Sequence, residues 1–180
     1  MKKIILIILI FLLAGVKAEA QVPQKNVTQV QVKKVEGKVQ WRRHSGSWKT
    51  ILSGDTLDEP SEIKNDDKGN LTLQFSEGSV VDLKADSEIE LESLHDPQNQ
   101  PLIWIRVKNG EIHGRIASFD SYRGFSINTE PALIVVDQGT PSFSVNQDQK
   151  SGLTTLAVEE GTVMIQPENP EIQPINLGAG

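Results

Sequence analysis

The residues best suited to binding chemistry are the tryptophans, the single tyrosine and the cations near them. Trp41 begins the run Trp41-Arg42-Arg43-His44, and an aromatic ring beside cations suits a glycan, a phosphate or another anionic ligand. In an extended strand Trp41 and Arg43 share one face, and Trp48 follows across a short turn, so two indoles lie on one hairpin. Trp41 also continues the inward position of Val39, which favours core packing over an exposed sugar platform. The predicted binding surface consists of Trp41, Arg43, Trp48, Trp104 and Tyr122.

No spacing of residues predicts catalysis, a bound metal or a cofactor. His44, His95 and His113 stand singly, without the HxH or HExxH spacing of metal sites. The run Ser61-Glu62-Ile63-Lys64 matches the SxxK pattern of penicillin-recognising serine enzymes, but Pro60 and the turn formers that follow do not allow the helix this chemistry needs. The chain has no cysteine, which excludes disulfides, thiolate metal sites and cysteine nucleophiles. We therefore expect a protein that is not an enzyme and uses no cofactor.

The elements that position these side chains are strands, because apolar residues after position 30 recur with a period of two. Turn-forming pairs separate the apolar runs about every ten residues, and Asn109-Gly110 is the strongest hairpin signal among them. No segment predicts a helix. The pattern predicts an all-β fold, a sandwich or flattened β-roll of many short strands, with a short β-helix as the alternative. The alternating runs include Val39 and Trp41; Leu71, Leu73 and Phe75; Ile103, Ile105 and Val107; Phe143 and Val145.

The first 20 residues predict an export signal. Met1-Lys2-Lys3 leads into a short apolar run and then into Ala18-Glu19-Ala20, which is typical of a cleavable secretory signal peptide. The run from Ile4 to Val16 is too short to span a membrane, so no stable transmembrane span is expected after cleavage. We divide the chain into a signal peptide (1–20), a lead-in (21–34) and a β domain (35–180). The expected location is the periplasm or the medium of a bacterium.

The net charge of the chain indicates which class of partner is not expected. The formal net charge of the 180-residue chain is -6, and removal of the signal takes away more basic than acidic residues. A non-specific nucleic-acid binder is expected to be basic, so no nucleic-acid partner is expected.

A series of phrases in the β domain resembles the FecR domain, an exported sensor and regulatory module of bacterial envelope proteins. Each phrase is short, but their order and spacing cover nearly the whole of residues 35–180. They are Gly37-x-Val39 with Trp48, Leu52 and Gly54-Asp55-x-Leu57; Leu71-x-Leu73-x-Phe75-x-Glu77-Gly78-Ser79-x-Val81-x-Leu83 with Ser87-x-Ile89; Gly110-Glu111-Ile112; and Phe125-x-Ile127-x-Thr129-x-Pro131-Ala132 with Gly139-Thr140, Phe143-x-Val145, Val158-x-Glu160-Gly161-x-Val163 and Leu177-Gly178-Ala179-Gly180.

The resemblance implies a non-enzymatic binding, scaffold or sensory module that acts through contacts with another envelope protein. Its motifs determine turns and buried faces and mark no catalytic group. Family members that control sigma factors carry a cytoplasmic domain and a membrane helix, whereas this chain begins with a short signal sequence, so the anti-sigma role is not carried over. Strand addition at an exposed sheet edge is one expected mode of contact. The alternative function, suggested by the aromatic residues, is a carbohydrate- or peptidoglycan-associated binding module.

Overall fold

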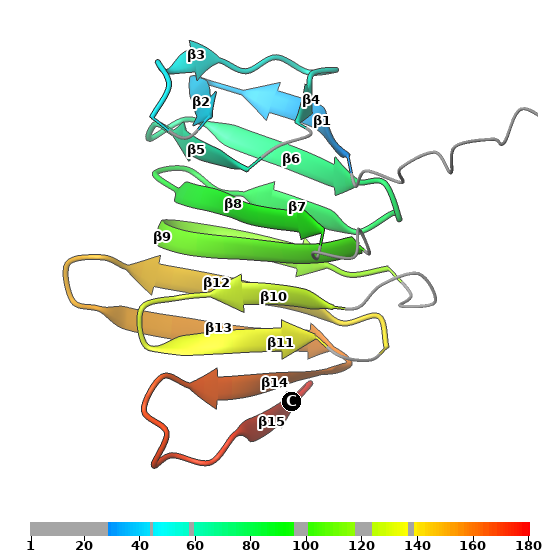
Figure 1. Cartoon of the computed structure of the whole chain (residues 1–180), viewed down its shortest axis with the longest axis vertical. Coiled ribbons are helices and arrows are strands. Elements are labelled where there is room, and N and C mark those ends of the chain that lie inside the picture. The colour runs from blue at the N-terminus through cyan, green and yellow to red at the C-terminus, as the bar shows by residue number, and fades with distance from the viewer. Residues whose placement is uncertain (1–28, 44, 58–59, 96–100, 118–123, 137–138) are drawn as a thin grey trace, which may run out of the picture.

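The computed structural model describes residues 29–180 except 44, 58–59, 96–100, 118–123 and 137–138. The described part is all-β, with fifteen strands and no helix, and none of it forms a helix long and apolar enough to cross a membrane. The strands form two facing layers that share one long strand (Figure 1). Sheet A contains, in spatial order, β4 (Thr56–Leu57), β1 (Val30–Glu36), β6 (Asn70–Phe75), β7 (Val80–Leu83), the second half of β9 (Pro101–Arg115), β12 (Ser142–Asp148) and β13 (Leu153–Glu160).

Sheet B is built in the same way around the first half of β9. Its pairs are antiparallel except for β9 and β10, which run parallel. This pairing confirms the predicted sandwich or roll, because a β-helix would stack its strands in parallel. Sheet B contains, in spatial order, β3 (Lys49–Thr50), β2 (Val39–Arg43), β5 (Ser61–Asn65), β8 (Glu88–His95), β9, β10 (Phe125–Asn128), β11 (Ala132–Val136), β14 (Thr162–Pro167) and β15 (Ile175–Gly178).

Alternating apolar residues of both sheets fill the space between the layers. Val81 and Leu83 from sheet A and Ile103 and Ile105 from sheet B are each 0% exposed. The rings of Phe75 in β6 and Phe125 in β10 meet edge to face across the layers, with centroids 5.9 Å apart. The period-two pattern of the sequence therefore marks the inner face of each strand.

The turn-forming pairs Ser45-Gly46, Glu77-Gly78 and Ser151-Gly152 each join neighbouring antiparallel strands, whereas Lys68-Gly69 joins β5 of sheet B to β6 of sheet A. In each one the glycine N–H donates to a carbonyl three or four residues earlier, at 2.8–3.0 Å. The prediction for Asn109-Gly110 is wrong, because these residues lie within β9 and not in a hairpin. Up to Asn109 the strand pairs with β8, and from Gly110 onward it pairs with β7 and β12.

The chain therefore passes from one sheet to the other at Gly110. Gly110 has a φ of +85°, and a Cβ there would lie 2.4 Å from Ser87 Oγ and 2.7 Å from the Asp86 carbonyl oxygen. The Asn-Gly pair supplies the positive φ of a turn, but it uses that geometry to bend one strand between two sheets.

The first strand starts earlier than the expected β domain. β1 begins at Val30 and lies between β4 and β6, so it includes residues 30–34 of the segment that the sequence set apart as a lead-in. Val30 and Val32 are 0% and 1% exposed. Two alternating valines are too few to predict a strand from the sequence. Pairing with β4 and β6 places this segment in the sheet. The predicted signal peptide lies outside the described residues.

Candidate binding surface

The sequence-predicted site residues fall into two separate places. Trp41, Arg43 and Trp48 belong to the β2–β3 hairpin at one end of sheet B, whereas Trp104 lies on β9 near the middle of that sheet. Tyr122 lies outside the described residues. The structure therefore brings together only the hairpin group.

Within the hairpin, both indoles are partly covered. Trp41 packs against the hydrophobic core, with the Arg43 guanidinium carbon and Lys49 Nζ 6.0 and 5.9 Å from its ring centroid. Arg42 and Lys64 lie over the ring of Trp48, at 4.5 and 4.1 Å from its centroid. These cation–π contacts occupy the ring surface that a sugar platform would need.

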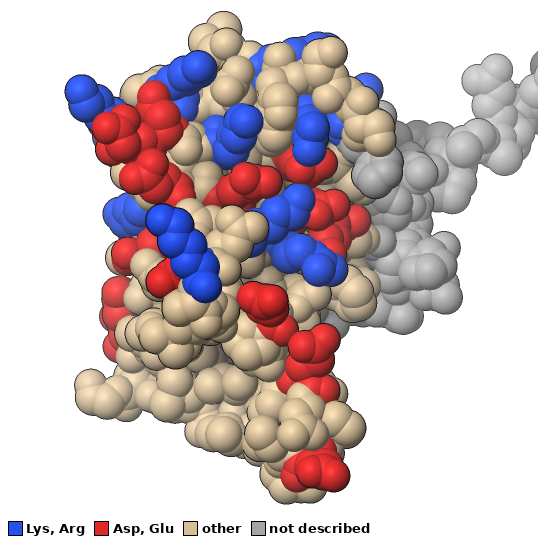
Figure 2. All heavy atoms as spheres, turned by 90° about the vertical axis from the view of Figure 1, so that its left-hand side faces the viewer, with Lys and Arg blue, Asp and Glu red and all other residues tan. Residues whose placement is uncertain are grey.

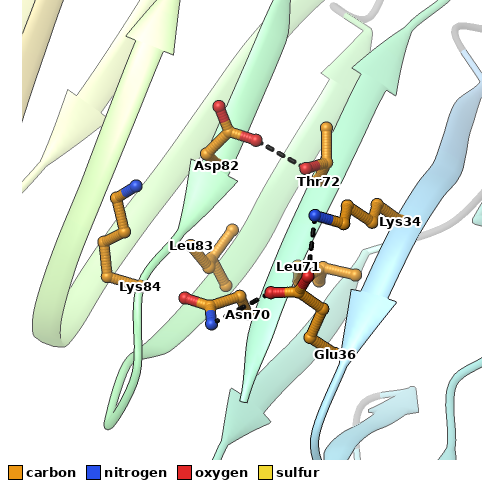
Figure 3. Close-up of a pocket in the computed structure, with 8 residues that line it drawn as sticks. All are labelled: Lys34, Glu36, Asn70, Leu71, Thr72, Asp82, Leu83 and Lys84. Atoms are coloured by element: carbon orange, nitrogen blue, oxygen red, sulfur yellow. Dashed lines mark hydrogen bonds and ion pairs between the residues drawn. The ribbon is translucent and has the colours of Figure 1, made fainter. Parts of the chain in front are cut away.

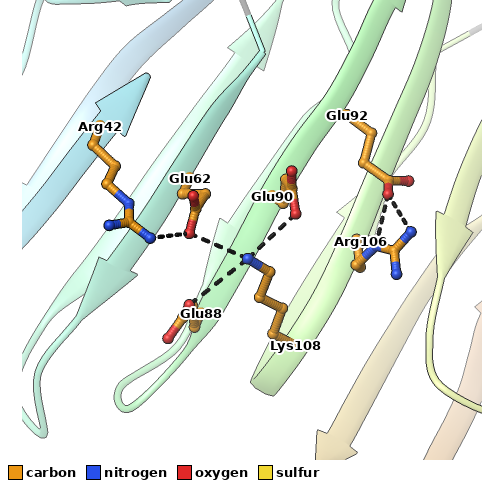
Figure 4. A network of polar contacts seen from close by, with 7 residues as sticks. All are labelled: Arg42, Glu62, Glu88, Glu90, Glu92, Arg106 and Lys108. Carbon is orange, nitrogen blue, oxygen red and sulfur yellow. Dashed lines mark hydrogen bonds and ion pairs between the residues drawn. The ribbon is translucent and has the colours of Figure 1, made fainter. Parts of the chain in front are cut away.

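Next to this hairpin, the outer face of sheet B carries a charge network (Figure 4). Glu62 on β5 lies directly opposite Glu90 on β8, and like charges at such a position repel. Lys108 on β9 reaches between them, with its Nζ 3.2 Å from a carboxylate oxygen of each and 3.9 Å from Glu88. Arg42 on β2 contacts Glu62 from the other side at 2.8 Å. Four strands thus contribute one interlocked set of charges.

The pKa values show that these charges support one another. The hydrogen bond from Arg42 holds the pKa of Glu62 below its ordinary value, and the hydrogen bond from Lys108 acts in the same direction. Partial burial opposes the charge on Lys108, but hydrogen bonds to Glu62 and Glu90 still raise the pKa of Lys108. Glu62 and Lys108 are therefore both charged at neutral pH, and their ion pair joins strands β5 and β9.

Trp104 is the exposed aromatic residue of this face. Its side chain is 42% exposed, and its strand neighbours in register are Ser93 and Ser126. Arg106, two residues further along the same face, makes a close ion pair with Glu92 through its Nη2 (2.5 Å) and Nε (2.6 Å). The exposed indole of Trp104 and the adjacent Arg106–Glu92 ion pair form a contact surface. They do not line a cavity that would enclose a ligand.

A shallow polar hollow lies on the outer face of sheet A (Figure 3), with a volume of about 360 Å³. Its polar groups also pair with one another. Lys34 binds Glu36 at 2.7 Å, the Thr72 hydroxyl donates to Asp82 at 2.6 Å, and Asn70 donates to Glu36 at 3.4 Å. The hydrogen bond and charge of Lys34 lower the pKa of Glu36, and Glu36 raises the pKa of Lys34. The polar side chains of the hollow are therefore held in contacts with one another.

The histidines do not form a site in the described part of the chain. His113, on the outer face of sheet A, contacts the Glu111 carboxylate at 2.5 Å. His44 and the side chain of His95 lie outside the described residues. Among the residues that the structure describes, no group of three or more histidine, aspartate or glutamate side chains is arranged to hold a metal ion.

None of the binding residues predicted from the sequence lies on the free edge of sheet A, which is formed by β13. β13 pairs with β12 and with no other strand in the described chain. It is eight residues long, whereas β3 and β4 at the opposite end of the two sheets have two residues each. The segment Leu153–Glu160 has a clear alternating pattern, but only the tertiary pairing shows that its second side has no partner strand.

Comparisons with known proteins support the resemblance seen in the sequence. The family model described as "FecR protein" matches residues 61–164. Two crystal structures of candidate anti-sigma factors from Parabacteroides distasonis resemble the fold, with TM-scores of 0.55 and 0.53, both at 19% identity. The matches cover 67% and 66% of this chain but only 52% and 51% of those chains, so this chain spans about half their length. The search of curated proteins found no match.

Proposed function

The chain belongs to the FecR protein family, and from this premise we propose that it is an exported, non-enzymatic regulatory module of the bacterial cell envelope that acts by binding another protein. The similar crystal structures belong to candidate anti-sigma factors, which is a regulatory role that depends on protein–protein contact. For this chain the proposal is limited to regulated binding in the envelope. Export is part of the proposal and follows from the signal-like residues 1–20.

The observation that carries the proposal is the free edge of β13. On the charged outer face of sheet B the cations and carboxylates pair with one another, and Trp48 is covered by cations. The backbone of β13 instead presents alternate N–H and C=O groups on the side away from β12. Such an edge is suited to recognition of an extended segment of another protein.

Site-specific photocrosslinking in the bacterium that encodes the chain tests this function. The photoreactive residue is placed at Thr155 on β13, at Trp104 on sheet B, or at the buried Val81 as a control. We expect a discrete protein adduct from at least one exposed position, none from position 81, and recovery of the chain in the periplasm or medium. Retention of the chain in the cytoplasm, or the absence of any adduct from both exposed positions under several growth conditions, would refute the proposal.

A further inference from the structure

The edge of β13 lacks the devices that protect sheet edges. Natural edge strands are commonly very short, or carry lysine, proline or a bulge along the free side. β13 has eight residues, LTTLAVEE, with neither lysine nor proline. Its charged residues, Glu159 and Glu160, lie together at its end, and the only register shift with β12 is there too. The stretch from Leu153 to Ala157 is therefore open to pairing.

Sheet B extends beyond this edge. After β9, sheet A has two further strands and sheet B has four, so β14 and β15 lie past β13 at that end of the molecule (Figure 1). At a spacing of about 4.8 Å between strands, the overhang is roughly 10 Å wide. The position in sheet A opposite β14 and β15 has no strand from the described chain.

The inner face of the overhang is apolar and incompletely covered. Val163 and Leu177 are register partners, and so are Ile165 and Ile175. Val163 is 1% exposed, whereas Ile175 is 51% exposed. The corner at Gly161 is closed, because the Ala179 N–H donates to the Gly161 carbonyl oxygen at 3.1 Å. Coverage of the apolar row thus decreases from this corner toward Ile175.

The charged residues of β13, β14, β15 and the connections between them are all acidic. Residues 151–180 contain four glutamates and no lysine, arginine or histidine. All four glutamate side chains are exposed. In Figure 2, basic side chains lie over the upper and middle parts of the molecule, and the end that carries β14 and β15 shows only acidic ones. The four residues are Glu159, Glu160, Glu168 and Glu171.

A second copy of the chain does not fit this edge. Antiparallel pairing of β13 with the same strand of another copy requires a two-fold axis perpendicular to sheet A. That axis would put both sheets B on the same side, and their overhanging strands would occupy the same space. A two-fold axis along the strands would instead turn Leu156 and Val158 of the second copy away from the apolar row.

We infer that the edge of β13 and the inner face of β14–β15 form a docking site for one extended segment of a partner protein, in which apolar residues alternate and basic residues flank them. The inference rests on the proposed function and names its site and the chemistry of its partner. The bound segment would continue sheet A through main-chain hydrogen bonds along Leu153–Ala157. Its inward side chains would cover Ile165 and Ile175, and its basic flanks would face the glutamates.

Selection from a random dodecapeptide library tests the site with the protein lacking residues 1–20. Peptides are selected on the unmodified protein, and the enriched sequences are measured by fluorescence anisotropy. We expect alternating apolar residues with flanking lysine or arginine, and affinity lowered about tenfold or more by Ile175→Asp, because a buried aliphatic contact is lost. Ile172→Asp is the matched control, since Ile172 is 50% exposed but lies in the connection between β14 and β15. Glu168→Lys with Glu171→Lys is expected to reduce binding of the same peptides.

The opposite results would overturn the inference. These are failure to enrich any peptide, enrichment without alternation or basic flanks, equal loss with Ile172→Asp, or a protein dimer in sedimentation that Thr155→Pro dissociates. A photocrosslinked partner captured from position 104 but not from position 155 would uphold the proposed regulatory binding and refute this docking site.

Discussion

At the scale of single residues, the most consequential side chain on sheet B is Lys108. Its Nζ lies between Glu62 and Glu90, which face each other across neighbouring strands. Without it, repulsion between the two carboxylates would act on the β5–β8 ladder, and only Arg42 would still neutralise Glu62. The ion network is therefore expected to stabilise the fold.

Lys108→Met tests this role. At pH 7 we expect the free energy of unfolding to fall by about 0.5–2 kcal/mol, because the methionine keeps the aliphatic stem and removes the charge. Since the hydrogen bond from Arg42 lowers the pKa of Glu62 in the folded state, ionised Glu62 stabilises the fold above its ordinary pKa of 4.5. This stabilisation is lost as the pH falls through the lowered folded-state value.

The difference in unfolding free energy between Lys108→Met and the unmodified protein should therefore shrink as the pH falls below 4.5 and Glu62 becomes protonated. Urea unfolding of both proteins from pH 7 to below pH 4.5 measures this difference in unfolding free energy. The exposed Lys33→Met serves as the control and should behave like the unmodified protein. A Lys108→Met variant with unchanged stability at pH 7 would show that the network contributes nothing.

At the scale of elements, β9 decides the architecture, because both sheets are built on it. Its bend at Gly110 lets residues 101–109 pair in sheet B and residues 110–115 pair in sheet A. The pair Asn109-Gly110 correctly indicated a positive φ at Gly110, but its interpretation as a hairpin turn was wrong. Local turn chemistry specifies a backbone angle, whereas the partners of the strand on either side are chosen by long-range packing.

Gly110→Ala is expected to lower the free energy of unfolding by at least about 2 kcal/mol, because it combines a strained backbone with a clash against Ser87. Gly54→Ala separates the two effects. Gly54 has a φ of +95°, but a Cβ there would meet nothing within 4 Å. Urea unfolding should therefore show a larger loss for Gly110→Ala, and equal losses would mean that the contact with Ser87 is relieved without cost.

At the scale of the whole molecule, the two sheets share one hydrophobic core, and β1 belongs to it. The boundary at residue 35, chosen from the sequence, would remove Val30 and Val32 and most of the strand that pairs with β6 on the side away from β7. A chain that starts at residue 35 is expected to lose about 3–6 kcal/mol of stability, at about 1.5–3 kcal/mol for each fully buried valine. A chain that starts at residue 29 should match the full-length protein in thermal and urea unfolding. If both shortened chains are equally stable, β1 is not part of the cooperative unit.

The sequence by itself determined the all-β class, the inward face of most strands, most of the turns and the family. These properties depend on residue type and on a period of two, which are local. Only the tertiary structure decided that β9 joins two sheets, that Arg42 and Lys64 cover Trp48, and that Lys108 neutralises carboxylates from neighbouring strands. It also decided that β13 has a free edge beneath an apolar overhang. These features depend on which distant segments become neighbours, and many pairings satisfy the same alternating pattern until the whole core is packed.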